Sequence, residues 1–70
     1  MKRYDIEARL RQLENWNHEQ YLNFSADAGS FYEHEVYQRG AEYYTRAEMH
    51  RMASVAIEKA LEPPKYAKEP

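Results

Sequence analysis

Glycine and proline, the residues that most often interrupt a helix, are rare in this chain. The glycines are Gly29 and Gly40, and prolines occur only at positions 63, 64 and 70. Nothing therefore breaks the chain from Arg3 to Ala28, which predicts long helices joined by short connections. We predict an all-α fold, with residues 1–62 as a single helical domain and residues 63–70 as a flexible, proline-containing tail.

A first helix is expected from about Tyr4 to Phe24, because apolar residues recur there at intervals of three or four. Asn17 interrupts this apolar stripe. Either the helix leaves the core at this residue, or a polar side chain lies within an interface, where asparagine can set the register of paired helices. The stripe consists of Ile6, Leu10, Leu13, Asn17, Tyr21 and Phe24.

Two capping patterns predict further helix starts. An S-x-x-E sequence at 30–33 follows Gly29 and predicts a second helix beginning at Phe31. A T-x-x-E sequence at 45–48 predicts a third helix beginning at Arg46. The competing interpretation is one long helix over residues 31–61, since neither glycine nor proline follows Gly40 in this segment.

The predicted third helix has a broad apolar face that contains several small residues. Small side chains let another helix approach closely, and the large aromatic residues of the middle helix could pack against them. We therefore predict a small three-helix bundle, with two longer helices flanking an aromatic-rich middle helix and with dimerisation as a way to complete it. The apolar face comprises Met49, Met52, Ala53, Ala56, Ile57, Ala60 and Leu61.

The short length of the chain limits the stability of an isolated domain. At 70 residues it has room for one modest core, and small scaffolds commonly add disulfides, a metal or a partner. Because the chain has no cysteine, association with another protein or with a second copy is the remaining device. No apolar run is long enough to span a membrane, and we expect a cytoplasmic protein.

Catalytic and metal-binding motifs are incomplete in this sequence. The His-Glu pairs at 18–19 and 34–35 lack the second histidine of H-E-x-x-H, because Leu22 and Gln38 occupy that position. No E-x-x-H pattern is present for a di-iron bundle. Glu33 is the best placed carboxylate for acid-base chemistry, yet its capping pattern already explains it. We predict no enzymatic activity, no catalytic residue, no metal and no cofactor.

Seven tyrosines beside a charged fraction of 31% are the unusual feature of the composition. The aromatic arc of the middle segment is too wide for one neighbouring helix to cover, so part of it is expected to face a partner. Tyrosine suits this role because its ring buries a large area while its hydroxyl tolerates water, and Gly40 would let a partner backbone approach. The predicted partner-binding residues are Trp16, Tyr32, Tyr37, Gly40, Tyr43 and Tyr44.

Nucleic-acid binding is the alternative hypothesis. Arg39, Arg46 and Arg51 lie among tyrosines, and aromatic side chains beside basic ones can stack on bases. However, Glu42 and Glu48 lie in the same segment, and the formal net charge of -2 provides no general attraction for nucleic acid.

A P-P-x-Y pattern at 63–66 could dock an aromatic groove on a partner protein.

These observations predict a small, non-enzymatic protein-interaction module that masks or bridges a surface on a larger protein or pairs with its own copy. By analogy with other small, cysteine-free chains alone, it would be an accessory protein of a phage or mobile element that inhibits a host or defence protein. The alternative is a helical regulator associated with nucleic acid.

Overall fold

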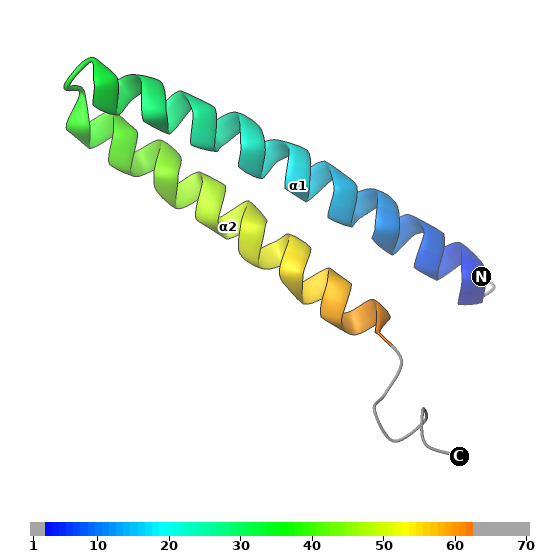
Figure 1. Ribbon diagram of the computed structural model, residues 1–70. Coiled ribbons are helices and arrows are strands. Elements are labelled where there is room, and N and C mark those ends of the chain that lie inside the picture. The colour runs from blue at the N-terminus through cyan, green and yellow to red at the C-terminus, as the bar shows by residue number, and fades with distance from the viewer. Residues whose placement is uncertain (1–2, 63–70) are drawn as a thin grey trace.

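The computed structural model describes residues 3–62, which form an antiparallel helical hairpin (Figure 1). Helix α1 spans Arg3–Glu33 and helix α2 spans Tyr37–Leu61. The all-α prediction is confirmed, but these residues form two helices where three were predicted. The predicted flexible tail at 63–70, with its P-P-x-Y pattern, lies outside the described residues.

Helix α1 continues through the point at which a break was predicted. Gly29 has no positive φ, and Ser30 lies inside the helix rather than capping a new one. A glycine in a helix interior costs about 1 kcal/mol relative to alanine. The continued helix carries Phe31 alongside Tyr43, with the two ring centroids 5.0 Å apart. This aromatic contact across the hairpin helps to offset the cost of Gly29.

The chain reverses between residues 34 and 36 in a Schellman motif, the usual hydrogen-bonded ending of an α-helix. The Val36 N–H donates to the Phe31 carbonyl at 2.8 Å, and the Glu35 N–H donates to the Tyr32 carbonyl at 3.1 Å. Glu35 adopts a left-handed conformation with a φ of 62°. Glycine normally occupies this position, so the sequence contained no conventional signal for the turn.

Helix α2 begins without a side-chain cap at Val36 and passes uninterrupted through the T-x-x-E pattern at 45–48. The Thr45 hydroxyl donates to the carbonyl of Ala41 at 2.9 Å, a bond within the helix. The prediction of a third helix starting at Arg46 is therefore wrong. The single helix over 31–61 is also wrong, because the chain turns at 34–36.

Glu35→Gly is expected to stabilise the hairpin by up to about 1 kcal/mol, because a non-glycine residue in the left-handed region is strained. Glu19→Gly, in the middle of α1, is the matched control and should destabilise by about 1 kcal/mol. Urea unfolding followed by circular dichroism would compare the two. A loss of stability in both variants would contradict the account of the turn.

The two helices meet along a seam of small and polar residues. Asn17, Ala28, Gly40 and Ala47 are buried, and no large side chain within residues 5–62 is completely buried. Larger residues cover the edges of the seam and stay partly accessible to solvent. The interior of the hairpin is consequently thin, as expected for two helices without a third layer.

The broad apolar face predicted near the C-terminal end is only partly used. Ile57 and Leu61 are half-buried against α1, whereas Met49 and Met52 are 66% and 62% exposed. The reason is that Ala47, seven residues after Gly40, continues the seam, and this places Met49 on the opposite side of α2. The predicted packing of the aromatic residues against the alanines is therefore wrong.

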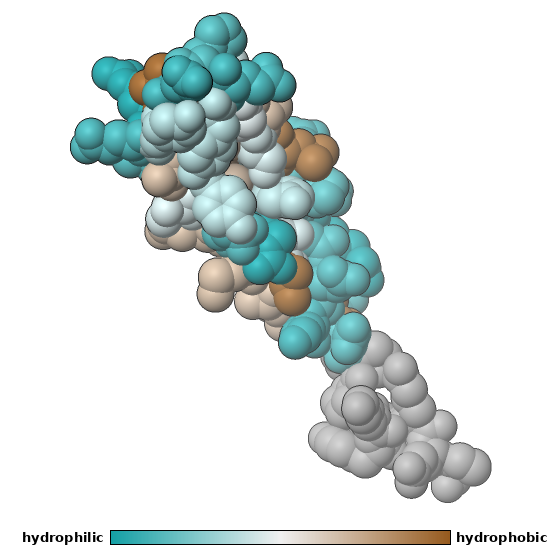
Figure 2. Space-filling model, turned by 60° about the vertical axis from the view of Figure 1, so that its left-hand side comes forward, coloured by the Kyte–Doolittle hydropathy of each residue, from teal (hydrophilic) through white to brown (hydrophobic). Residues whose placement is uncertain are grey.

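Apolar residues reach the surface over much of the hairpin. Figure 2 shows brown and near-white residues between the hydrophilic ones along the face in view, so the hydrophilic coat is not continuous. Neither of the described helices is long and apolar enough to cross a bilayer.

Candidate interaction surface

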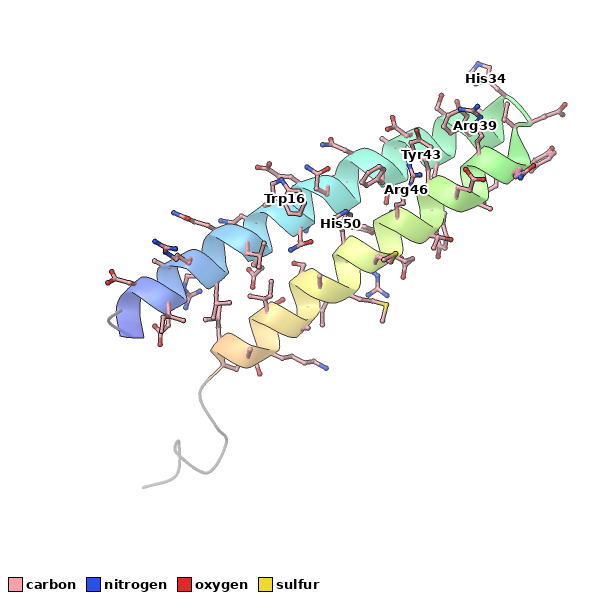
Figure 3. The ribbon with its side chains drawn as sticks, turned by 180° about the vertical axis from the view of Figure 1, so that it is seen from behind. Trp16, His34, Arg39, Tyr43, Arg46 and His50 are labelled. Atoms are coloured by element: carbon pink, nitrogen blue, oxygen red, sulfur yellow. The ribbon has the colours of Figure 1, made fainter. Side chains whose placement is uncertain are left out.

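A row of stacked and edge-on rings joins the two helices on one side of the hairpin (Figure 3). Tyr43 of α2 lies against Phe31 and Phe24 of α1, with centroid distances of 5.0 and 5.8 Å. His50 stacks on Phe24 at 5.5 Å and meets the edge of Trp16 at 5.3 Å. We call these five residues the aromatic ladder. Each aromatic pair of this kind contributes about 0.5–1.5 kcal/mol beyond simple burial.

A polar pair, His50 and Asn17, lies near the Trp16 end of the ladder. The His50 Nδ1 donates to the Asn17 amide oxygen at 2.8 Å, and the Asn17 amide nitrogen donates to the Leu13 carbonyl at 2.9 Å. No buried side-chain nitrogen or oxygen in the described part of the chain is left without a partner. Asn17 is thus satisfied from both helices, and it fits the predicted alternative of a polar residue within an interface.

Asn17→Ala is expected to lower the free energy of unfolding by about 1–3 kcal/mol. The substitution removes the hydrogen-bond acceptor of His50, and partial burial limits its replacement by water. Asn15→Ala is the matched control, since Asn15 is exposed on the same helix. Thermal and urea unfolding would measure both. Equal effects of the two substitutions would show that the amide pair does not hold the helices together.

Three exposed tyrosines form a second feature near the turn, which we call the tyrosine surface. Tyr32, Tyr37 and Tyr44 are 41%, 60% and 54% exposed. The rings of Tyr32 and Tyr37 lie 6.3 Å apart across the turn. Tyr44 follows Tyr37 by seven residues, so both side chains project from the same side of α2. The tyrosine surface therefore presents rings from both helices.

The predicted partner-binding residues divide between two sides of the hairpin. At 100° per residue, Trp16 and Tyr32 project from α1 about 160° apart. Trp16 and Tyr43 belong to the aromatic ladder, whereas Tyr32, Tyr37 and Tyr44 form the tyrosine surface. Trp16 is itself half exposed at the end of the ladder. The structure thus brings together three of the predicted residues as an exposed group.

Gly40 is buried beneath the tyrosine surface rather than open to a partner. A Cβ at this position would lie 3.0 Å from two atoms of the Tyr32 ring. The close approach that Gly40 permits is therefore made by a ring of the same chain. This contact holds Tyr32 flat against α2 and helps to fix the shape of the tyrosine surface.

Gly29→Ala is expected to raise the free energy of unfolding by about 1 kcal/mol, because no atom lies within 4 Å of the added methyl group and alanine favours the helix. Gly40→Ala should gain clearly less or lose stability, because the Tyr32 ring must move. Urea unfolding of both variants checks the difference. Equal gains would mean that Tyr32 is not held by Gly40.

The three arginines of the nucleic-acid hypothesis differ in their surroundings. Arg51 is held by Glu48, with an N–O distance of 2.7 Å, and this hydrogen bond lowers the pKa of the Glu48 carboxyl. The Arg46 guanidinium lies over the Tyr43 ring, 5.0 Å from its centroid. Arg39 is exposed on the same side of α2 as Arg46, as Figure 3 shows. Arg39 and Arg46 therefore flank the aromatic ladder, while Arg51 is occupied elsewhere.

The histidines are separated by their positions in the hairpin. His18 lies beside Tyr21, with ring centroids 6.1 Å apart, and the Nδ1 of His34 donates to the Ser30 carbonyl at the turn. His50 belongs to the ladder. No group of three metal-ligating side chains is present in residues 3–62.

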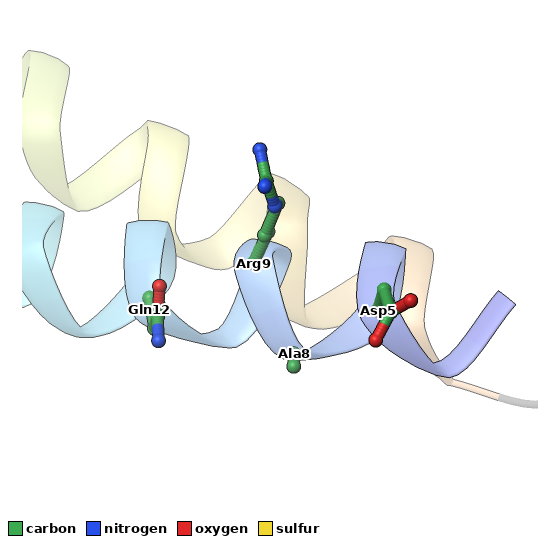
Figure 4. A pocket seen from close by; sticks show the side chains of 4 residues that line it. All are labelled: Asp5, Ala8, Arg9 and Gln12. Atoms are coloured by element: carbon green, nitrogen blue, oxygen red, sulfur yellow. The ribbon is translucent and has the colours of Figure 1, made fainter. Parts of the chain in front are cut away.

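One open depression lies on the outer surface of α1 near its N-terminal end (Figure 4). It measures about 500 Å³, and the four side chains that line it come from two successive turns of one helix. Within residues 3–62, the lining of this depression therefore comes from α1. The lining residues are Asp5, Ala8, Arg9 and Gln12.

Sequence reasoning missed the role of His50 in joining the helices. A usable signal was present in the heptad spacing of Gly40, Ala47 and Ser54, because residues seven apart lie on one side of a helix. That row places His50 beside the seam. In the structure, His50 is level with Asn17 of α1.

No known protein family matches this chain, and neither a curated protein nor a solved structure is significantly similar to it. The functional conclusion therefore comes from the geometry of the hairpin itself.

Proposed function

We propose that this protein is a small, non-enzymatic interaction module that binds another protein through the tyrosine surface. The observation that supports this proposal is the exposure of Tyr32, Tyr37 and Tyr44 as one group beside the turn. Rings presented in this way resemble the aromatic anchors that supply most of the binding energy at protein interfaces.

The tyrosine surface is suited to binding because little motion is lost when a partner covers it. The Tyr32 ring is already held against Gly40 and lies beside Tyr37. Tyrosine has few rotatable bonds, and its hydroxyl can hydrogen-bond either water or a partner. Preorganised side chains reduce the entropy cost of association.

Masking or bridging of a larger protein is consistent with the two-sided hairpin, since Trp16 emerges on the side away from Tyr32. A narrower proposal is that the protein is an accessory protein of a phage or mobile element and inhibits a host or defence protein in the cytoplasm. This proposal rests on analogy with other small, cysteine-free chains. It adds a biological setting to the same surface.

Tyr37→Ala and Tyr44→Ala, combined in one chain, are expected to weaken capture of the partner from the source cell at least tenfold, a change of about 1.4 kcal/mol. Quantitative mass spectrometry of material retained on the immobilised protein measures this effect. Gln38→Ala is the matched control, because Gln38 is exposed between the same residues. Unchanged capture by a folded double variant would refute the proposal.

A nucleic-acid regulator is the second candidate, favoured by the position of Arg39 and Arg46 beside the aromatic ladder. Fluorescence anisotropy with single-stranded and duplex oligonucleotides would test it. Binding that falls steeply with salt and is lost in Arg39→Ala and Arg46→Ala would support this candidate. Arg51→Ala should then have a smaller effect, because Glu48 already holds that side chain.

A further inference from the structure

Helix α2 carries apolar residues on two opposite sides, of which the hairpin uses one. Gly40 and Ala47 are buried against α1. Met49 and Met52 project from the far side and are 66% and 62% exposed, although both are large and apolar. A helix that is apolar on both sides is typically covered on both sides.

The exposed residues of this far side recur with coiled-coil spacing. Positions 42, 45, 49, 52, 56 and 59 are separated by alternating steps of three and four, the spacing that keeps side chains facing one partner helix. We call this row the outer seam. Every one of its positions is exposed, and its members are Glu42, Thr45, Met49, Met52, Ala56 and Lys59.

The outer seam has the same spacing when it is read backwards. Its midpoint lies between residues 50 and 51, so a second copy running in the opposite direction presents matching positions at each level. Met49 is then level with Met52 of the second copy, and Thr45 is level with its Ala56. A two-fold interface needs a surface that is complementary to itself in this way.

Charge complementarity selects the antiparallel arrangement. The same alignment places Glu42 in one layer with Lys59 of the second copy, and this pairing occurs at both ends of the seam. A parallel alignment would instead place Glu42 against Glu42 and Lys59 against Lys59. Like charges at matched positions are unfavourable, so they discriminate between the two orientations.

Small residues border the outer seam and allow two α2 helices to approach closely. Ala41 and Ala60 are level with each other in the antiparallel alignment, and Ala53 adds a third small side chain. Alanine at the margins of a helix pair reduces the distance between the helix axes. The central methionines can adapt their shape to fill the remaining space.

We propose that a second copy of this chain packs on the outer seam, so that two α2 helices pair antiparallel and the two α1 helices lie outside them. The proposal does not rest on the tyrosine surface. Tyr37 and Tyr44 lie about 90–110° around α2 from the midline of the outer seam. The dimer therefore leaves both tyrosine surfaces available for another protein.

Sedimentation equilibrium of the full chain over a range of concentrations tests the proposal directly. The unmodified protein is expected to form dimers, and Met49→Glu with Met52→Glu in one chain should weaken dimerisation at least tenfold. Leu22→Glu is the matched control, because Leu22 is a large exposed residue of α1 outside the seam. It should leave dimerisation unchanged.

A charge reversal keeps the test independent of any folding defect. Glu42→Lys and Lys59→Glu should each weaken the dimer, whereas both substitutions in one chain should restore it. Failure of the double variant to recover would contradict the proposed pairing of Glu42 with Lys59.

Crosslinking reports the orientation, because the chain has no native cysteine. Chains with Thr45→Cys, mixed with chains carrying Ala56→Cys, should crosslink to each other through a short bifunctional maleimide. Thr45→Cys alone should not crosslink, since the two copies of this residue lie about 16 Å apart along antiparallel helices. Efficient crosslinking of Thr45→Cys alone would overturn the antiparallel arrangement.

A monomer at all concentrations, or a dimer that is indifferent to both glutamate substitutions, would overturn the proposal as a whole. These results are distinct from a failure of partner binding. Tyr37→Ala with Tyr44→Ala should preserve the dimer, so the tyrosine surface and the outer seam can fail separately.

Discussion

The hydrogen bond between His50 and Asn17 is the interaction on which the arrangement of the two helices depends. It places a donor from α2 and an acceptor from α1 in a seam otherwise made of small residues. Sliding one helix along the other would separate the buried Asn17 amide from the half-buried His50 ring, and losing this hydrogen bond is a cost that apolar contacts alone would not impose. Phe24 and Trp16 enclose His50 on two sides, so the polar bond and the ring contacts specify the same register.

Helical structure was predictable from the sequence, but the position of the turn was not. The scarcity of glycine and proline correctly indicated an all-α chain. The break was assigned to Gly29, since glycine commonly ends helices, whereas tertiary contacts of Phe31 and Tyr32 extend α1 beyond it. Glu35 supplies the left-handed residue instead. Local propensity at a single position is too weak to determine a boundary that contacts across the hairpin can override.

The candidate surface was predictable in its residue types rather than in its layout. Exposure of Tyr37 and Tyr44 agrees with the expectation that the aromatic residues outnumber what one helix can cover. Their separation from Trp16 depends on where α1 ends. Because the sequence analysis misplaced the turn, it did not predict this separation. The exposed methionines were assigned to the packed apolar face for a different reason. When a helix has two apolar sides, its sequence does not show which side faces the neighbouring helix.

The hairpin has both helix ends remote from the turn, as Figure 1 shows. Arg3 and Leu61 lie at one end, and Tyr37 lies at the other, separated from Leu61 by a helix of about 36 Å. The protein is thus a stalk whose aromatic tip stands well clear of its base. In the proposed antiparallel dimer, Gly40 of each copy is level with Leu61 of the other, so the two tips point in opposite directions and each lies beside the base of the second copy.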